Sequence, residues 1–193
     1  MIDIPAPVVL ASASPARREL LGRLVGEFEV MPPDVCEESI LHDQPEQTAR
    51  ARAAAKARAV SRIRPRSVVI GADTVVACGE ELMGKAADAE EALAMLRKLT
   101  RHPHRVLTAL CVASPNGGER TACEGATVHM RELPPEELQR LARRPGALRW
   151  AGAYALQPDD PNVLSIEGCE TTVMGLPIER LREMLLELCA ESE

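Results

Sequence analysis

The segment around residues 12–18 carries polar and cationic side chains that suit a phosphate. Ser12 and Ser14 follow a short apolar run, and Pro15 predicts the first position of a helix that contains Arg17. Backbone N–H groups at a helix N-terminus attract anions, and an arginine in the first turn opposes the helix dipole unless an anion compensates it. The segment is therefore either a phosphate-binding loop or a Ser-Pro helix start with solvated arginines.

An aspartate lies inside an otherwise apolar stretch, in the run Gly71-Ala72-Asp73-Thr74. Aspartate is disfavoured in buried strands and is costly there unless it has a partner. A metal ion or a water held for attack would be such a partner. The alternative is an aspartate at a strand end that bonds to nearby backbone.

Two lysines can supply positive charge to the same phosphate. Lys85 follows Gly84, whose missing side chain leaves the neighbouring backbone accessible, and Lys56 lies in an alanine-rich segment with several arginines. The alternative interpretations are a surface turn for Lys85 and a solvated helix face for Lys56.

A loop after the second predicted strand contains Asp34, Glu37 and Glu38. Carboxylates are ligands that Mg²⁺ and Mn²⁺ prefer, although acid-rich loops are also ordinary solvated surface. His102 and His104 have the spacing of a metal pair, but no third histidine is close in sequence. We expect a structural or hydrogen-bonding role for both histidines.

Composition excludes several other classes of protein. Only 2% of the 193 residues are aromatic and the net charge is -6, which disfavours modules that stack bases or bind nucleic acid through a basic face. The six cysteines form no C-x-x-C pair, and the sequence has no G-x-x-x-x-G-K-[ST] loop, G-x-G-x-x-G fingerprint or G-x-S-x-G elbow. Neither a signal peptide nor an apolar run long enough to span a membrane is evident, so we expect a cytoplasmic protein.

Apolar runs and turn residues predict the elements that must position these side chains. The expected strands cover 8–11, 28–31, 67–78 (interrupted at Gly71), 106–114, 121–130 and 163–167, and the expected helices begin near Pro15, Glu46, Asp88, Pro134 and Pro177. Asn116-Gly117-Gly118 predicts a hairpin turn. The alternation of helices with strands, together with the hairpin, predicts an α/β fold with a mixed sheet.

Taken together, several segments resemble the Maf nucleotide pyrophosphatases. The similar stretches keep their order and spacing over almost the whole chain, and they are Leu10–Leu21, Ala55–Ala59, Ile70–Val76 with Gly84-Lys85, Ala151–Gln157 and Val173–Pro177. Each stretch is modest alone, whereas their joint occurrence is specific. We therefore expect one Maf-like domain over residues 1–193.

The resemblance implies a fold like that of the inosine triphosphate pyrophosphatases, with an elongated mixed sheet flanked by helices, two lobes and a central cleft. It also implies hydrolysis of a nucleoside triphosphate to its monophosphate and pyrophosphate, with Mg²⁺ or Mn²⁺ as cofactor. By position it implies catalysis for Asp73, Lys56 and Lys85, phosphate binding for Ser12, Ser14 and Arg17, and metal binding for Asp73 with Glu37.

Three positions resemble the substrate selectors of the family: Ala16, Thr74 and Gln157. Thr74 and Gln157 match the branch that acts on dTTP and UTP, whereas Ala16 fits neither this branch nor the branch that acts on 7-methyl-GTP. The chain also departs from the family at 157–161, where glycines are usual, and at Ala86, where proline is usual. These departures concern base selectivity more than the chemistry.

The leading prediction is a house-cleaning enzyme that acts on dTTP, UTP or modified pyrimidine nucleotides. A pyrophosphatase for 7-methyl-GTP or another modified purine is the alternative among enzymes. A nucleotide-binding regulator of cell division and septum formation is the alternative outside enzymes. The resemblance implies a homodimer, and the apolar stripe of the last helix can either serve that purpose or pack on its own sheet.

Overall fold

The computed structural model describes residues 1–154 and 160–190 of the chain. Gln157, a predicted selector, lies outside the described residues. The strands are β1 (Val8–Ala11), β2 (Glu29–Val30), β3 (Val68–Cys78), β4 (Glu81–Met83), β5 (His104–Ala113), β6 (Glu119–Met130) and β7 (Val163–Glu167). The α-helices are α1 (Pro15–Gly22), α2 (Pro45–Ser61), α3 (Ala89–Leu99), α4 (Pro135–Ala142), α5 (Glu170–Val173) and α6 (Ile178–Ala190), with short 3₁₀ turns at Glu37–Ser39 and Ala147–Arg149.

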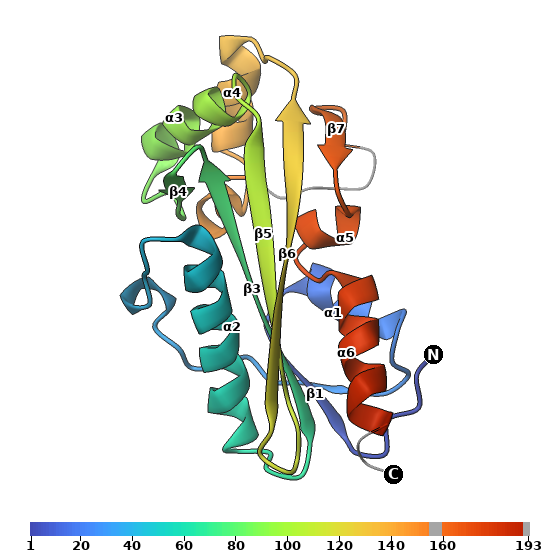
Figure 1. Cartoon of the computed structure of the whole chain (residues 1–193). Helices are drawn as coiled ribbons and strands as arrows, with labels where there is room; N and C mark the ends of the chain where they lie inside the picture. Colours follow the sequence, from blue (N-terminus) through green and yellow to red (C-terminus); the bar gives the residue numbers. More distant parts are fainter. Residues whose placement is uncertain (155–159, 191–193) are drawn as a thin grey trace.

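One mixed sheet organises these elements (Figure 1). Its strand order is β2-β1-β3-β5-β6-β7, and β4 pairs with β3 off this path. The pairs β1–β2 and β1–β3 are parallel, whereas β3–β4, β3–β5, β5–β6 and β6–β7 are antiparallel. In Figure 1 the long strands β3, β5 and β6 run through the molecule, with α2 on one side and α1 and α6 on the other. The predicted mixed sheet flanked by helices is confirmed.

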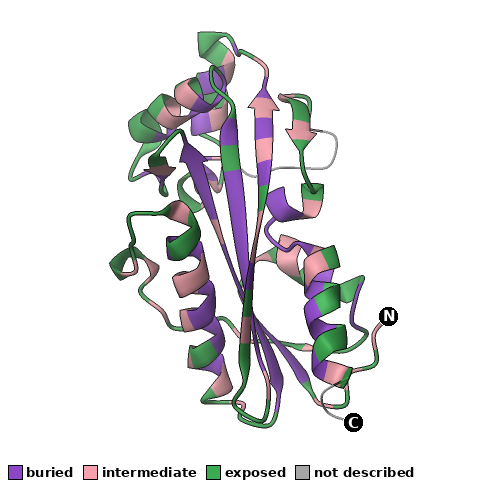
Figure 2. Ribbon diagram, viewed as in Figure 1, coloured by how far each residue is buried: buried purple, intermediate pink, exposed green. Residues whose placement is uncertain are grey.

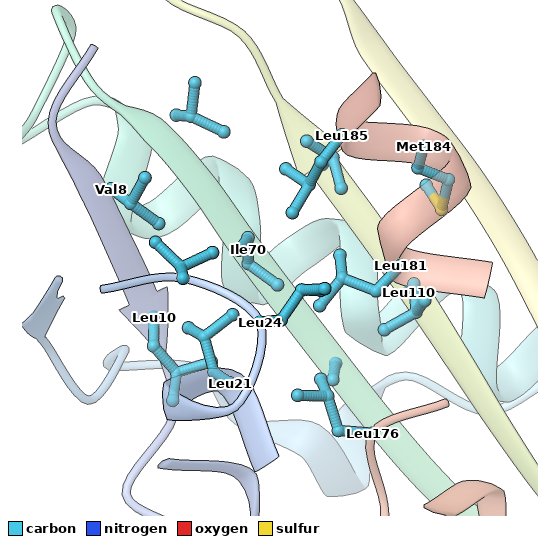
Figure 3. Packing of buried hydrophobic residues seen from close by; sticks show 14 of the residues in the cluster. Val8, Leu10, Leu21, Leu24, Ile70, Leu110, Leu176, Leu181, Met184 and Leu185 are labelled. Carbon is cyan, nitrogen blue, oxygen red and sulfur yellow. The ribbon is translucent and has the colours of Figure 1, made fainter. Parts of the chain in front are cut away.

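Alternating side chains of the strands contribute to a core cluster on each face of the sheet. On one face, Val8, Ile70 and Leu110 pack with leucines of α1 and α6 (Figure 3). On the other face, Val9, Val69 and Cys111 pack against the alanines of α2. Purple therefore follows the strands and the inner sides of the helices in Figure 2.

The apolar stripe of α6 belongs to the first of these cores. Leu181, Met184, Leu185 and Leu188 are all buried in it. The stripe therefore packs on the sheet of its own chain. Among the helices over residues 1–154 and 160–190, none has both the length and the apolar character needed to cross a bilayer.

The predicted interruption of the third strand at Gly71 is wrong, because β3 continues through this residue for 11 residues in all. A Cβ on Gly71 would lie 2.4 Å from the Ala53 carbonyl oxygen and 2.8 Å from the Ala57 nitrogen. Gly71 is thus required by the close approach of the α2 backbone and does not mark a break in the strand. The same close approach brings the side chains of α2 to the next residues of β3.

Candidate active site

The site forms at an open stretch of one edge of β3. β1 ends where Ala11 pairs with Gly71, and β4 pairs only from Val76 onward. Between these points, no strand of the described chain covers this edge, although β5 covers the other. The backbone oxygen of Ala72 accepts hydrogen bonds there from Arg17 Nη1 at 3.0 Å and from Lys56 Nζ at 3.4 Å. Two cations, one from each face of the sheet, therefore meet at this gap.

Lys56 joins the two carboxylates of the site. Its Nζ lies 2.6 Å from Asp73 Oδ1 and 3.1 Å from Glu37 Oε1. Asp73 is 3% exposed and Lys56 is 5% exposed, while Glu37 is half-buried. The interpretation of Lys56 as part of a solvated helix face is wrong: the alanines of α2 bring the helix so close to β3 that this side chain is buried.

One oxygen of Asp73 is left without a partner. Oδ2 is buried and makes no hydrogen bond within the described part of the chain. A buried carboxylate oxygen without a partner is costly, so a ligand that fills this position would stabilise the site. The orphaned oxygen marks where water or a cation would bind.

Arg17 is held by backbone and hydroxyl groups from several elements. Nε donates to the Gly175 carbonyl at 2.8 Å, Nη1 donates to the Ala72 carbonyl at 3.0 Å and to Ser12 Oγ at 3.4 Å, and Nη2 donates to Thr74 Oγ1 at 3.0 Å. These contacts engage four of the five N–H groups of a guanidinium. Within the described chain, one N–H on Nη2 remains for a ligand.

Lys85 approaches the same acids from the solvent side. Its Nζ lies 3.7 Å from Glu37 Oε2 and 3.8 Å from Glu38 Oε1, and its side chain is 49% exposed. The backbone at Lys85 pairs with Ala151, and Gly152 N donates to the Gly84 carbonyl at 3.0 Å. Two stretches that resemble the Maf family are thus held side by side. Because Lys85 is exposed, it can turn toward a ligand at little cost.

Burial and charge push the pKa values of the acids in opposite directions. Desolvation raises the pKa of Asp73 above its ordinary value, against the opposing influence of Lys56 and Arg17. Desolvation also acts to raise the pKa of Glu37, but Lys56, Lys85 and Arg17 outweigh it and the pKa lies below its ordinary value. Burial lowers the pKa of Arg17, opposed by Asp73 and Glu37. Asp73 is therefore the better proton acceptor and Glu37 the more persistent anion.

The remaining predicted residues lie around the start of α1. Ser12 is buried, and its Oγ accepts from Ser14 N at 3.2 Å. Ser14 is the N-cap of α1, since its Oγ accepts from Arg17 N at 3.4 Å. Ala16 is half-buried on the first turn, and Thr74 is half-buried on β3. The structure brings Ser12, Arg17, Glu37, Lys56, Asp73, Thr74 and Lys85 into one contact network.

A separate groove of about 1260 Å³ lies on the other side of α1. Residues in and next to α1 and β2 line it, among them Ser14, Arg18, Phe28 and Glu29. Asp73, Lys56 and Lys85 are not among its lining residues, so it is distinct from the network above.

The sequence did not point to Thr108 or to the role of Gly175. Thr108 is fully buried on β5 and its Oγ1 lies 2.9 Å from Thr74 Oγ1. Gly175 has a φ of +96°, and a Cβ there would lie 3.1 Å from Thr74 Oγ1. A threonine within an apolar strand carries no distinguishing signal. A glycine in Val-Met-Gly-Leu-Pro does indicate a turn, and that signal could have marked Gly175.

Comparison with known proteins identifies the family. A "dTTP/UTP pyrophosphatase" of Aquifex aeolicus is 43% identical over 182 residues, which cover 94% of this chain and 95% of the relative. A "7-methyl-GTP pyrophosphatase" of Nitrosococcus oceani is 35% identical and covers 94% of both chains. The solved structure of a nucleoside-triphosphatase / dITP/XTP pyrophosphatase from Mycobacterium abscessus is similar with a TM-score of 0.48 and 16% identity, covering 95% of this chain and 96% of that one. The family described as "Maf-like protein" matches residues 7–188, and the chain belongs to this family.

Proposed function

We propose that this protein hydrolyses nucleoside triphosphates to a nucleoside monophosphate and pyrophosphate, with dTTP and UTP as the preferred substrates. The observation that carries the proposal is the buried carboxylate of Asp73 bound to Lys56 beside Glu37, Arg17 and Lys85. The relative of Aquifex aeolicus that matches over nearly its whole length is named a dTTP/UTP pyrophosphatase, which supports this choice of substrate.

The reaction needs a base, a nucleophile and cations for the phosphates. A water attacks the α-phosphorus, the bond to the oxygen that bridges the α- and β-phosphates breaks, and pyrophosphate leaves. Asp73 takes the proton of that water, since its carboxylate lies in the site with one buried oxygen that has no partner within the described part of the chain. The orphaned Oδ2 is the atom that this water or its proton would meet.

The cationic side chains of the site would stabilise the negative charge that develops on the phosphates during the reaction. Lys56 is fixed between Asp73 and Glu37, so its ammonium stays in the site as the negative charge on the leaving pyrophosphate grows. Arg17 adds one N–H and a fixed positive charge, and Ser12 accepts from the same guanidinium. The exposed Lys85 is free to turn from Glu37 and Glu38 toward the β- and γ-phosphates.

The donor set fits a hard divalent cation such as Mg²⁺ or Mn²⁺. Asp73 has a buried oxygen without a partner, and Glu37 has a lowered pKa that keeps it ionised. No group of three or more His, Cys, Asp or Glu side chains over residues 1–154 and 160–190 can hold a metal by itself. Mg²⁺ is commonly bound by one or two carboxylates plus substrate phosphates and water, so two carboxylates suffice. Bound there, the metal ion would supply Lewis-acid polarisation of the phosphate oxygens.

The experiment measures pyrophosphate release from dTTP, UTP, CTP and 7-methyl-GTP in the presence of Mg²⁺ or Mn²⁺. Asp73→Asn preserves the shape of the side chain but removes the base, so we expect kcat to fall by about 10²–10⁴-fold. Asp88→Asn is the matched control, because the Asp88 side chain caps α3 by accepting from Glu90 N and Glu91 N, and asparagine caps equally well. An Asp73→Asn variant that keeps more than a tenth of the wild-type rate contradicts the proposed role.

A second substrate class has a specific observation in its favour. The relative of Nitrosococcus oceani is named a 7-methyl-GTP pyrophosphatase and is 35% identical to this chain. Ala16, half-buried on α1, stands at a position that resembles a selector of the family and does not match the dTTP/UTP branch there. Preferential release of pyrophosphate from 7-methyl-GTP in the same panel would replace the pyrimidine assignment while leaving the reaction unchanged.

A further inference from the structure

A continuous hydrogen-bond chain runs from the site into the sheet. Arg17 Nη2 donates to Thr74 Oγ1 at 3.0 Å, Thr74 Oγ1 lies 2.9 Å from Thr108 Oγ1, and Thr108 Oγ1 donates to the Thr172 carbonyl at 2.7 Å. The four residues come from α1, β3, β5 and α5. The chain thus connects four elements at one point of the site.

The direction of every bond in this chain is determined by its two ends. A carbonyl can only accept, so the single O–H of Thr108 is used by Thr172. Thr108 must therefore accept in its contact with Thr74, and the single O–H of Thr74 points to Thr108. A guanidinium can only donate, so Arg17 occupies one lone pair of Thr74. Thr74 is left with one lone pair and no proton to donate.

Of the two hydroxyl groups in the chain, this lone pair belongs to the one on the less buried residue. Thr108 is fully buried, whereas Thr74 is half-buried. Gly175 lies beside the Thr74 hydroxyl, and a Cβ at this position would approach Thr74 Oγ1 to 3.1 Å. The backbone of residue 175 also has a left-handed φ of +96°, which favours glycine. A glycine at residue 175 therefore avoids a close contact between a side chain and the Thr74 hydroxyl.

We propose that Thr108 is a positioning residue that makes Thr74 an acceptor-only contact, so that the site selects pyrimidine bases whose N3 carries a hydrogen. Uracil and thymine carry this N–H donor at N3, whereas the N3 of cytosine is an acceptor and meets the lone pair of Thr74 unfavourably. The inference rests on the proposed pyrophosphatase function and supplies a physical basis for its preference for dTTP and UTP. Sites built to bond a substrate N–H reject analogues that lack it.

The test compares kcat/KM for UTP and CTP in the wild type and in Thr108→Val. Valine keeps the shape of threonine but cannot accept, so the Thr74 hydroxyl is free to rotate and donate to N3 of cytosine. We expect the ratio of kcat/KM for UTP to kcat/KM for CTP to fall by about tenfold. The reason is that the repulsion between the Thr74 oxygen and N3 of cytosine is replaced by a hydrogen bond. Thr108→Ser keeps the hydroxyl and should retain the wild-type ratio.

Thr100→Val is the matched control. Thr100 is buried and donates from Oγ1 to the Leu96 carbonyl at 2.9 Å, at the end of α3 and outside the site. This variant loses a comparable buried hydrogen bond, so a purely structural effect would appear in it as well. The ratio of kcat/KM for UTP to kcat/KM for CTP in Thr100→Val should equal that of the wild type.

A measurement on the wild type alone keeps the proposal testable should Thr108→Val fail to fold. UTP methylated at N3 lacks the donor, whereas UTP methylated at C5 keeps it, and only the first should lose about tenfold or more in kcat/KM. An unchanged ratio in Thr108→Val, or equal rates with the two methylated nucleotides, overturns the role of Thr108. Absence of pyrophosphate release from every nucleotide by the wild type would instead overturn the proposed function.

Discussion

The ammonium group of Lys56 is the contact that holds the two acids of the site together. It lies within ion-pair distance of both Asp73 and Glu37, and its side chain is 7% exposed. Removing one partner of a buried pair leaves the other charge uncompensated, which costs far more than removing an exposed partner. Lys56 therefore contributes to the stability of the fold as well as to the charge of the site.

Replacement of Lys56 by methionine should destabilise the protein by about 3 kcal/mol, since Asp73 is left buried with one cation fewer. Lys56 also opposes the desolvation that raises the pKa of Asp73, so the acid limb of the pH–activity profile should move to higher pH in any residual activity. Urea unfolding and a pH profile of kcat/KM measure the two effects.

Arg58→Met on the same helix is the control for that variant. Arg58 pairs with Glu119 at 2.7 Å, but its side chain is 57% exposed. Exposed pairs contribute about 0–1 kcal/mol, so this variant should unfold close to the wild type. Equal losses from both substitutions would contradict the importance of burial at Lys56.

How far single residues could be predicted depended on how unusual they are in their sequence context. Asp73 is a charged residue in an apolar run, which makes it conspicuous. Lys56 has three arginines close to it in the same helix, so composition alone favoured a solvated face; only the packing of α2 on Gly71 shows that it is buried. Thr108 could not be found, because its role depends on contacts with residues 34 and 64 positions away.

At the scale of the elements, Gly71 determines how closely α2 lies on β3. The Ala53 carbonyl and the Ala57 nitrogen both approach within 3 Å of the place where a Cβ would stand. These are backbone atoms of a helix, so they cannot yield by a change of rotamer. The distance between Lys56 and Asp73 follows from this contact, because Lys56 precedes Ala57 and Asp73 lies two residues beyond Gly71.

Gly71→Ala should therefore push α2 away from the sheet. We expect a loss of about 2–3 kcal/mol in the free energy of unfolding, the range for overpacking a tight contact, together with a loss of activity as Lys56 moves from Asp73. Chemical denaturation and pyrophosphate release measure these effects. Gly84→Ala is the stability control, since a Cβ there meets nothing within 4 Å. If Gly71→Ala were as stable as Gly84→Ala, the close packing of α2 would not constrain the site.

Most of the longer elements were predictable because each shows a strong local signal. The run Val-Val-Leu-Ala, the Ser14 and Asp88 caps and the turn at Asn116–Gly118 all lie where they were expected. The short elements β4 and α5 were not predicted, since three or four residues carry too little periodicity to be recognised. Their formation depends on pairing with β3 and packing against β5 and β6, which are tertiary effects.

At the scale of the whole molecule, a buried histidine links the sheet to the segment that pairs with Lys85. His104, at the start of β5, is 1% exposed, and its Nε2 lies 2.8 Å from the Tyr154 hydroxyl. The two rings meet edge to face with centroids 5.5 Å apart. Tyr154 follows Ala151, whose backbone pairs with Lys85. The expected hydrogen-bonding role is confirmed for His104.

Burial lowers the pKa of His104 to about 4, against 6.5 for an unperturbed histidine. Between these values the unfolded chain binds a proton that the folded protein does not, so the free energy of unfolding falls as the pH falls. This histidine alone should lower the stability by about 2 kcal/mol between about pH 7 and pH 5. Urea denaturation at the two pH values measures the change.

His104→Gln should remove this part of the pH dependence, because glutamine keeps an amide near the Tyr154 hydroxyl but does not titrate in this range. His102→Gln is the matched control, since His102 is exposed two residues earlier and its replacement should leave the pH dependence as in the wild type. A wild type and a His104→Gln variant that lose the same stability between about pH 7 and pH 5 would show that His104 is protonated without unfolding. In that case, the contact with Tyr154 would have to yield to solvent at the acidic pH, and the segment that pairs with Lys85 would move with it.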